Sequence, residues 1–324
     1  MNEVVDLLPD DFFEAGLRAD ALCGLTADPK WLPPKWFYDD RGSELFEQIT
    51  VLPEYYPTRA EREILADRAA EIAVVSKAET LVELGAGSAD KTQLLLDALR
   101  DSGSLHTFVP VDVSTGALRG AVASTAAGYP GLKIVAVAAD FETHLGDVAQ
   151  LTGAGRRLVA FLGGTIGNLL PEQRATFLQT LRSTLHPGDT VLLGTDLVKS
   201  PDVLVPAYDD AAGVTAEFNK NVLHVLNREL KADFDVDAFT HLAVWDAEHE
   251  WIEMRLRSSV DQLVRIELLG LEVTFARGEE MRTEISAKFR REGVAAEMAA
   301  AGFELGEWWT DSAGRFGLSL SSAV

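Results

Sequence analysis

The sequence predicts an α/β protein: a parallel sheet covered by helices on both faces, with a second domain of mixed α+β structure. Two observations support this fold class. Short, nearly continuous apolar runs alternate with helical segments from residue 60 to residue 198, as in sheets that are buried on both faces. Segments 251–257 and 271–275 alternate apolar and polar residues with period two, which is typical of antiparallel strands with one solvated face.

The predicted parallel sheet opens with a helix that has apolar spacing over residues 61–72. Five buried strands follow, and each ends close to a glycine or an acidic residue. They are residues 80–84, 108–113, 134–140, 157–162 and 190–196. At the other end of the chain, a helix at 294–301 precedes strands at 303–310 and 316–321. We expect this helix and antiparallel pair to complete the same sheet.

The change of pattern along the chain predicts two domains, each built from separate segments. We assign residues 60–198 plus 288–324 to the first domain, and 1–59 plus 199–287 to the second. The amino-terminal segment is rich in aromatic residues and in prolines, which keep it out of helix interiors. The second half of the second domain begins with an expected helical stretch over 208–229.

Composition restricts the possible partners. Apolar residues make up 47% and charged residues 25% of the 324 residues, as in folded globular proteins. Lys and Arg number 29 against 51 Asp and Glu, a formal net charge of −22, which argues against a nucleic-acid partner and suits small, cationic molecules. The single cysteine, Cys23, allows no internal disulfide and no cysteine-based metal site. With neither a signal peptide nor a membrane span expected, the sequence predicts a cytoplasmic protein that binds no metal and no membrane.

A glycine turn follows the first predicted strand and precedes a helix. Glycine at positions 85 and 87 lets the backbone turn sharply and lie close to a ligand. Asp112 ends the next strand, where a carboxylate can accept hydrogen bonds from both ribose hydroxyls of a nucleoside. The motif could also serve turn geometry alone, with the acids simply facing solvent at the strand ends.

Two nucleoside cofactors suit this arrangement. The dinucleotide fingerprint would have a third glycine where this chain has Asp90, and an acid is electrostatically unfavourable beside a pyrophosphate. S-adenosylmethionine has no phosphate and carries a positive sulfonium, so the acidic pattern that begins at Glu83 favours it over NAD. Asp140, followed by Phe141, closes the third strand, where an acid can meet the adenine amine.

The loop after the fourth strand, Gly163 to Leu169, lies where ligands of open parallel sheets bind. Asn168 in this loop offers one acceptor and two donors. The Pro-Pro-aromatic motif that is typical of nucleic-acid amino-methyltransferases is missing here, which favours a small substrate. A purely structural turn is the alternative interpretation.

With these motifs in view, the sequence resembles the histidine-specific N-alpha-methyltransferases of ergothioneine biosynthesis. The resemblance covers nearly the whole chain and rests on segments 32–39, 52–59, 161–168, 208–215 and 284–286. It implies a Rossmann-like class I S-adenosylmethionine-dependent methyltransferase core with a second α+β substrate-binding domain. The implied activity converts L-histidine, through its mono- and dimethylated intermediates, to hercynine, consuming three molecules of S-adenosylmethionine. We expect a monomer.

The resemblance also implies which residues bind the two substrates. On the substrate side it implies Asn168 and Tyr208 around the carboxylate and amine, Tyr38 and Tyr55 near the amine and imidazole, and Met254, Glu284 and Ser286 at the imidazole end. On the donor side it implies Gly85, Lys91, Asp112, Asp140, Phe141 and Thr165. Ala86 and Gly164 stand where some relatives have serine, which puts donor affinity in doubt more than the chemistry. Whether Lys91 contacts the ligand or only places a charge at a helix start is left open.

Three alternative functions remain at this point. A binding module with a degenerate methyltransferase fold should have lost Asp112 or Asn168, and both are present. A methyltransferase of another small amino acid or amine is the closer alternative, because a fold does not determine a substrate. NAD-linked oxidoreduction is the weakest of the three.

Overall fold

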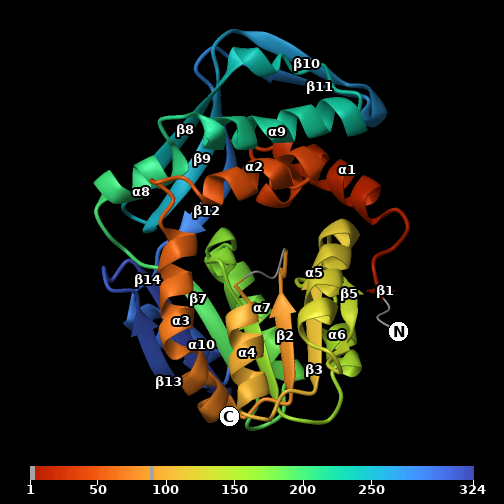
Figure 1. Cartoon of the computed structure of the whole chain (residues 1–324). Helices are drawn as coiled ribbons and strands as arrows, with labels where there is room; N and C mark the ends of the chain where they lie inside the picture. Colours follow the sequence, from red (N-terminus) through yellow and green to blue (C-terminus); the bar gives the residue numbers. More distant parts are fainter. Residues whose placement is uncertain (1–3, 88–90) are drawn as a thin grey trace. The chain divides into compact units, whose positions relative to one another are not determined.

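The computed structural model describes residues 4–87 and 91–324, so Ser88, Ala89 and Asp90 of the glycine turn lie outside the described residues. The chain divides into two compact units (Figure 1). Unit 1 comprises the segment that ends at Pro9 together with Pro57–Leu197 and Phe289–Val324. Unit 2 comprises Asp10–Tyr56 and Val198–Lys288.

Unit 1 contains a nine-stranded sheet with the order β1-β5-β3-β2-β6-β7-β14-β13, and β4 also pairs with β3. Pairing is parallel from β1 through β7, whereas β14 and β13 run antiparallel. The strands are β1 Val4–Asp6, β2 Thr80–Leu84, β3 Thr107–Asp112, β4 Lys133–Ile134, β5 Ala136–Ala138, β6 Arg157–Phe161, β7 Thr190–Asp196, β13 Phe303–Thr310 and β14 Phe316–Ala323. Strand order reverses between β2 and β6, which places a ligand crevice at the carboxyl ends of these strands. The predicted Rossmann-like α/β core is confirmed.

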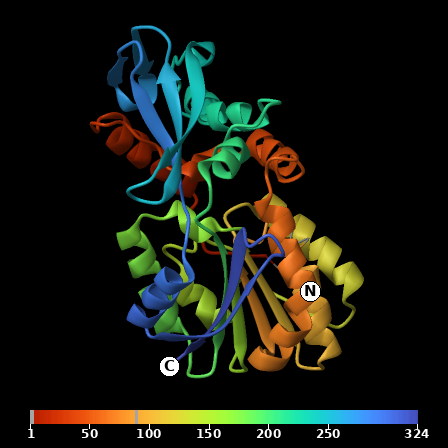
Figure 2. The same cartoon turned by 90° about the vertical axis from the view of Figure 1, so that its left-hand side faces the viewer.

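Helices cover both faces of this sheet, as the buried apolar strands require. They are α3 Pro57–Ser76, α4 Gln93–Asp101, α5 Thr115–Gly128, α6 Leu145–Leu151, α7 Pro171–Thr184 and α10 Arg291–Ala300, with a 3₁₀ turn, η2, at Thr165–Asn168. Figure 2 shows the sheet between α7 and α10 on one side and α3 and α5 on the other. Side chains of α3, α4 and α5 share one apolar core with the sheet, including Leu65, Leu95 and Ala121.

The structure corrects three details of the sequence-based assignment in unit 1. The predicted strand at 134–140 is two short strands, β4 and β5, and it ends at Ala138, so Asp140 lies beyond the sheet edge. Residues 4–9 belong to unit 1 rather than to the second domain, because Val4 to Asp6 pair in parallel with Ala136 to Ala138. Residues 57–59 also belong to unit 1, because they open the long helix α3.

Unit 2 combines helices with two antiparallel sheets, β12-β9-β8 and β10-β11. Its helices are α1 Phe12–Leu25, α2 Asp40–Thr50, α8 Pro201–Tyr208 and α9 Val214–Glu229, with 3₁₀ turns η1 Pro34–Phe37, η3 Val236–Ala238 and η4 Glu267–Leu269. Its strands are β8 Phe239–Asp246, β9 Trp251–Ser258, β10 Gln262–Ile266, β11 Leu271–Phe275 and β12 Glu280–Ala287. The expected helix over 208–229 is interrupted: α8 ends at Tyr208, and α9 begins after Gly213, whose φ of 78° suits glycine.

One apolar core fills unit 2 and joins its amino-terminal helices to the later strands. Phe37, Phe218, Leu226, Ile252 and Phe275 are among its members, and each is at most 3% exposed. The sequence separation of these residues explains why the unit needs both of its chain segments. No helix in the part of the chain that the structure describes is long and apolar enough to cross a membrane.

Candidate active site

The glycine turn of unit 1 is held by the neighbouring strand. Gly85 and Gly87 have φ values of 70° and 51°, a backbone region that favours glycine. The Gly85 amide donates to the carbonyl of Val111 at 2.9 Å, and the Gly87 amide donates to a carboxylate oxygen of Asp112 at 3.0 Å. The turn is therefore anchored to the end of β3, beside the residue expected to bind the ribose.

Asp112 accepts a second backbone hydrogen bond, from the amide of Ser114 at 2.8 Å. Burial raises the pKa of Asp112, and the amides of Ser114, Gly87 and Val113 oppose that change. Each carboxylate oxygen can accept more than one hydrogen bond, so both keep capacity for ligand hydroxyls. Asp112 can thus shape the turn and bind a ribose at the same time.

Glu83 lies in β2 and is 4% exposed. One of its oxygens accepts a hydrogen bond from the Thr92 hydroxyl, while the other has no hydrogen-bond partner among the described residues. The pKa of Glu83 is raised to about 8, mainly by burial and also by the charges of Glu61 and Asp112, while the hydrogen bond from Thr92 and the charge of Lys91 act in the opposite direction. A buried carboxyl oxygen without a partner is costly, so this position suits a ligand that brings a donor or a positive charge.

Glu61 is a functional candidate that the sequence analysis did not identify. It lies on α3, is fully buried, and accepts the Gly163 amide at 2.8 Å as well as the Lys91 ammonium. Gly194 faces the same carboxylate, since a Cβ there would come within 2.3 Å of it. Lys91 is therefore held by Glu61 and is only partly exposed, at 25% of its side chain. An acid on an amphipathic helix gives no sequence signal for such a role.

The remaining donor-side residues surround the loops after β5 and β6. A carboxylate oxygen of Asp140 accepts a hydrogen bond from the backbone amide of Glu142 at 2.8 Å. The ring centres of Phe141 and Phe161 lie 5.1 Å apart. The Thr165 hydroxyl donates to the Leu162 carbonyl at 3.1 Å, which stabilises the turn that carries Asn168.

The two glycines of that turn, Gly163 and Gly164, have φ values of 79° and 72°. Asn168 is half-buried, and its side chain makes no hydrogen bond within residues 4–87 and 91–324. Its amide is therefore available to a ligand.

The carboxylates of Glu61 and Asp112, the Lys91 ammonium and the buried carboxyl of Glu83 line this edge of the sheet. That donor set fits a cationic nucleoside such as S-adenosylmethionine, with Asp112 placed for the ribose hydroxyls and Glu83 carrying an unpartnered oxygen. Among the described residues, no group of three or more His, Cys, Asp or Glu side chains could hold a metal ion.

The predicted substrate tyrosines belong to unit 2, where a series of ring contacts links them. The ring of Tyr38 lies 5.5 Å from Phe46, Phe46 lies 6.3 Å from Tyr55, and Tyr55 lies 6.4 Å from Tyr208. Tyr55 and Tyr208 are buried, whereas Tyr38 is 40% exposed. The structure therefore brings three predicted residues, from two distant chain segments, to one aromatic cluster.

A β-bulge in β12 changes which residues of the strand face the core. Before the bulge Arg282 stands opposite Arg255, and after it Glu284 stands opposite Met254. The one extra residue, Thr283, shifts the alternation of the strand. As a result, Glu284 and Met254, two of the predicted imidazole-end residues, share the inner face of the sheet.

Glu284 is 9% exposed. Burial raises its pKa to about 7, although the positive charge of Lys288 acts in the opposite direction. Its carboxylate has no hydrogen bond or ion pair with any other residue that the structure describes. A buried carboxyl group in this state is suited to accept an N–H from a ligand.

Beyond Glu284, the inner face of β12 continues with Ser286, and Lys288 follows directly after the strand. The Tyr208 hydroxyl lies 2.7 Å from the Ser286 hydroxyl, and the Lys288 ammonium donates to both, at 2.8 and 2.7 Å. Lys288 is 4% exposed and lies 4.6 Å from the centre of the Tyr208 ring. Lys288 was not predicted as a site residue, because a lysine that directly follows a strand is usually an exposed surface charge.

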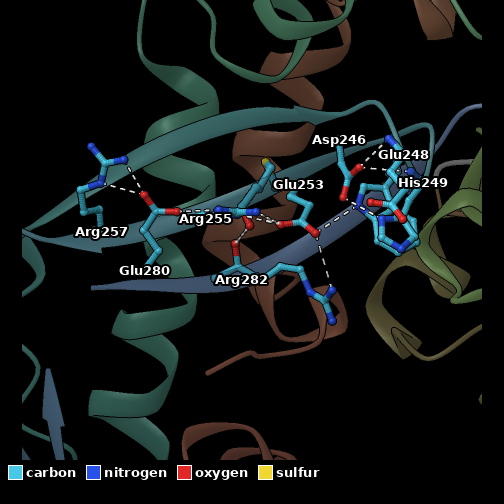
Figure 3. Close-up of polar contacts among 11 residues, drawn as sticks. Asp246, Glu248, His249, Glu253, Arg255, Arg257, Glu280 and Arg282 are labelled. Atoms are coloured by element: carbon cyan, nitrogen blue, oxygen red, sulfur yellow. Dashed lines mark hydrogen bonds and ion pairs between the residues drawn. The ribbon is translucent and has the colours of Figure 1, made fainter. Parts of the chain in front are cut away.

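On the outer face, the same strands carry a ladder of paired charges (Figure 3). The Glu280 carboxylate accepts hydrogen bonds from Arg257 at 2.9 Å and from Arg255 at 2.7 Å. Arg255 also donates to Glu253 at 2.7 Å. Glu253 also lies 3.7 Å from Arg282. Every acid in this ladder thus has at least one arginine partner, unlike Glu284 on the inner face.

Comparison with known proteins agrees with this chemistry. The family model described as "Histidine-specific methyltransferase, SAM-dependent" matches residues 17–323. The chain is 59% identical to "Histidine N-alpha-methyltransferase" of Mycolicibacterium smegmatis and 56% identical to the protein of that name from Mycobacterium tuberculosis, in both cases over 98% of each chain. It is 28% identical to "Ergothioneine biosynthesis protein 1" of Neurospora crassa, over 87% of this chain and 32% of that protein.

The match to the family extends through both units, and the donor-side acids and the inner face of β12 both lie within the matched residues. The chain belongs to the S-adenosylmethionine-dependent, histidine-specific methyltransferase family.

Proposed function

We propose that this protein transfers three methyl groups from S-adenosylmethionine to the α-amine of L-histidine, forming hercynine for ergothioneine biosynthesis. The observation that carries the proposal is Glu284, a buried carboxyl on the same sheet face as Met254 that has no side-chain partner among residues 4–87 and 91–324. An imidazole N–H is a donor suited to that carboxyl. The names of the bacterial relatives and of the fungal relative support the substrate and the pathway.

In this proposal residues of unit 1 bind the donor. When bound, S-adenosylmethionine supplies an electrophilic methyl group. Asp112 holds the ribose hydroxyls, Asp140 and Phe141 hold the adenine, and Gly85, Lys91 and Thr165 shape the rest of the donor site. The acidic donor set described above supports this assignment.

On the substrate side, Asn168 and Tyr208 hold the carboxylate and amine, and Glu284 and Ser286 hold the ring. Methyl transfer to nitrogen needs a neutral amine held in line with the methyl group, so positioning can supply a large part of the rate acceleration, up to about 7–11 kcal/mol. Tyr38 helps Asn168 and Tyr208 to aim the amine at the methyl group, and Tyr55 contributes a ring face to the ammonium that forms, a contact worth about 0.5–2 kcal/mol. Met254 adds adaptable apolar surface beside the ring.

The enzyme proposed here works in the cytoplasm as a monomer and takes the mono- and dimethylated histidines as intermediates. It uses no metal and binds neither nucleic acid nor membrane.

The test is direct. Purified protein is incubated with S-adenosylmethionine and each amino acid in turn, and the masses of the products are measured by mass spectrometry. We expect a gain of three methyl groups with histidine and with no other amino acid at comparable rates. No gain with histidine, combined with methylation of another amine, would instead assign the protein to that substrate.

A further inference from the structure

A continuous chain of buried hydrogen bonds crosses unit 2 from the bulge of β12 to the end of α8. The Thr283 hydroxyl lies 2.6 Å from Asn219 Oδ1, and Asn219 Nδ2 lies 2.8 Å from His241 Nδ1. His241 Nε2 lies 2.7 Å from the backbone carbonyl of Tyr208. Thr283 and Asn219 are fully buried, and His241 is 6% exposed.

The direction of each bond in this chain follows from its acceptors. Asn219 Nδ2 also contacts the Arg255 carbonyl at 3.1 Å, and because a carbonyl only accepts, this atom must be the amide NH₂ group. His241 Nδ1 therefore accepts, so the proton of the neutral ring is on Nε2 and is donated to the Tyr208 carbonyl. Burial lowers the pKa of His241, which agrees with a neutral ring.

The two ends of the chain adjoin two residues of the proposed amino-acid site, Glu284 and Tyr208, and the Tyr208 hydroxyl also lies 2.7 Å from Ser286. Thr283 directly precedes Glu284, and its hydroxyl also lies 3.0 Å from the carbonyl of Met254. The other end holds the backbone of Tyr208, whose side chain is assigned to the carboxylate and amine. The proposed reaction needs neither Asn219 nor His241 for its chemistry.

We infer that Thr283, Asn219 and His241 are positioning residues that, together with the hydrogen bond between Tyr208 and Ser286, fix the separation between Glu284 and Tyr208, and that this separation selects substrates by length. The inference rests on the proposed function. Histidine places its ring one methylene from the α-carbon, so a fixed separation excludes a homologue with a second methylene. One methylene in a fitted site typically changes relative efficiency by about 10- to 200-fold.

The test compares kcat/KM for L-histidine with that for its homologue carrying one extra methylene between the α-carbon and the ring. Thr283→Val keeps the shape of the side chain but removes the hydroxyl, whereas Thr283→Ser keeps the hydroxyl. Thr240→Val is the matched control, since Thr240 is exposed on β8 and precedes His241. His241→Phe breaks the chain at its far end, away from Glu284.

We expect Thr283→Val and His241→Phe each to reduce the preference for histidine over the homologue by about tenfold, mainly through KM, with kcat changed less than about threefold. Thr283→Ser and Thr240→Val should keep the wild-type preference. Thermal unfolding and donor affinity measured by calorimetry show whether each variant is folded.

The inference is wrong if folded variants keep the wild-type preference for length. It is also wrong if both chain-breaking variants fail to fold, since the chain would then serve only the core. Failure of the wild-type protein to methylate histidine would instead overturn the proposed function, whatever the variants do.

Discussion

The acidic residues on the two faces of the β12-β9-β8 sheet differ in whether they have arginine partners. On the outer face, Glu280 bridges Arg255 and Arg257, and although burial raises its pKa, these two arginines lower it overall (Figure 3). On the inner face, Glu284 belongs to the same strand, has no arginine partner, and its pKa rises to about 7. The outer acids are paired with arginines, whereas the inner acid has no ion pair with any residue that the structure describes.

Unit 1 shows the same contrast. Asp189 is buried against Arg157 at 2.7 Å, at the edge of the sheet away from the glycine turn, and that pair is structural. Glu83 and Asp112 lie beside the glycine turn, and burial raises the pKa of both. Glu83, Asp112 and Glu284 thus differ from Asp189 and Glu280, whose carboxylates form ion pairs with arginines. The predictions below test this distinction.

The largest effect is expected at Asp112. Asp112→Ala removes a charged acceptor for the ribose hydroxyls and also releases the Gly87 amide. Donor affinity, measured by titration calorimetry, should fall by about 1.5–3 kcal/mol. Asp189→Ala is the contrasting variant, which should lower the unfolding temperature more than it changes donor affinity. Unchanged donor affinity in a folded Asp112 variant would remove this residue from the donor site.

Glu284→Ala should reduce kcat/KM for histidine by roughly tenfold to a hundredfold, or about 1–3 kcal/mol. The side chain of an apolar amino acid has no N–H to donate to the carboxylate, so kcat/KM for that substrate should fall less. The ratio of kcat/KM between histidine and the apolar amino acid should therefore decrease. Steady-state kinetics with histidine and with a bulky apolar amino acid measure both effects. A variant that keeps full histidine activity and the same order of substrates shows that Glu284 is not the partner of the imidazole.

Most of the fold could be predicted from the sequence because it follows from local pattern. The buried runs at 80–84 and 190–196 form strands with those bounds, and segments 251–257 and 271–275 form antiparallel strands as expected. The ends of helices and the short strands were harder to predict. The pairing of residues 4–6 with β5 depends on a distant partner, which no local pattern reveals.

The candidate site was predictable only where a motif marks it. Gly85 and Asp112 stand at strand ends, where position alone suggests a ligand, and the resemblance supplied Glu284 and Ser286. The partners of these residues could not be found in this way. Glu61 reaches Gly163 across 102 positions, and such contacts exist only after the chain has folded.

A pH series sharpens the contrast between the two sheet faces. With a pKa of about 7, Glu284 is about one-tenth ionised at pH 6 and about nine-tenths ionised at pH 8. Because the ionised form accepts the stronger hydrogen bond, KM for histidine should fall severalfold over this range. Glu284→Gln, which does not titrate, should lose that part of the KM profile. The rise of kcat toward alkaline pH, which follows deprotonation of the substrate amine, should persist in both proteins.

Glu61→Gln tests a buried acid that does have a basic partner yet lies at the donor site. The amide oxygen can still accept from Gly163, but the charge that holds Lys91 is lost. We expect donor affinity to fall by about 1 kcal/mol, less than for Asp112→Ala, with KM for histidine unchanged. Calorimetry with the donor and steady-state kinetics with histidine measure the two quantities. A larger change in histidine KM than in donor affinity would contradict the assignment of Glu61 to the donor side.

The smallest effect is expected on the outer face, at Glu280→Gln. Arg255 and Arg257 are 30% and 48% exposed, and ion pairs of this kind contribute about 0–1 kcal/mol each. Because the pKa of Glu280 is lowered in the folded protein, its stabilising contribution is present above the unfolded-state pKa and is lost as pH falls through the folded value. Urea unfolding should therefore show a small loss of stability at pH 7 and a smaller difference from wild type in acid. KM for histidine should be unchanged, because Glu280 is already paired with two arginines and is not assigned to the substrate. A histidine KM that rises as much as in Glu284→Ala would show that pairing with arginine does not separate structural from functional acids in this sheet.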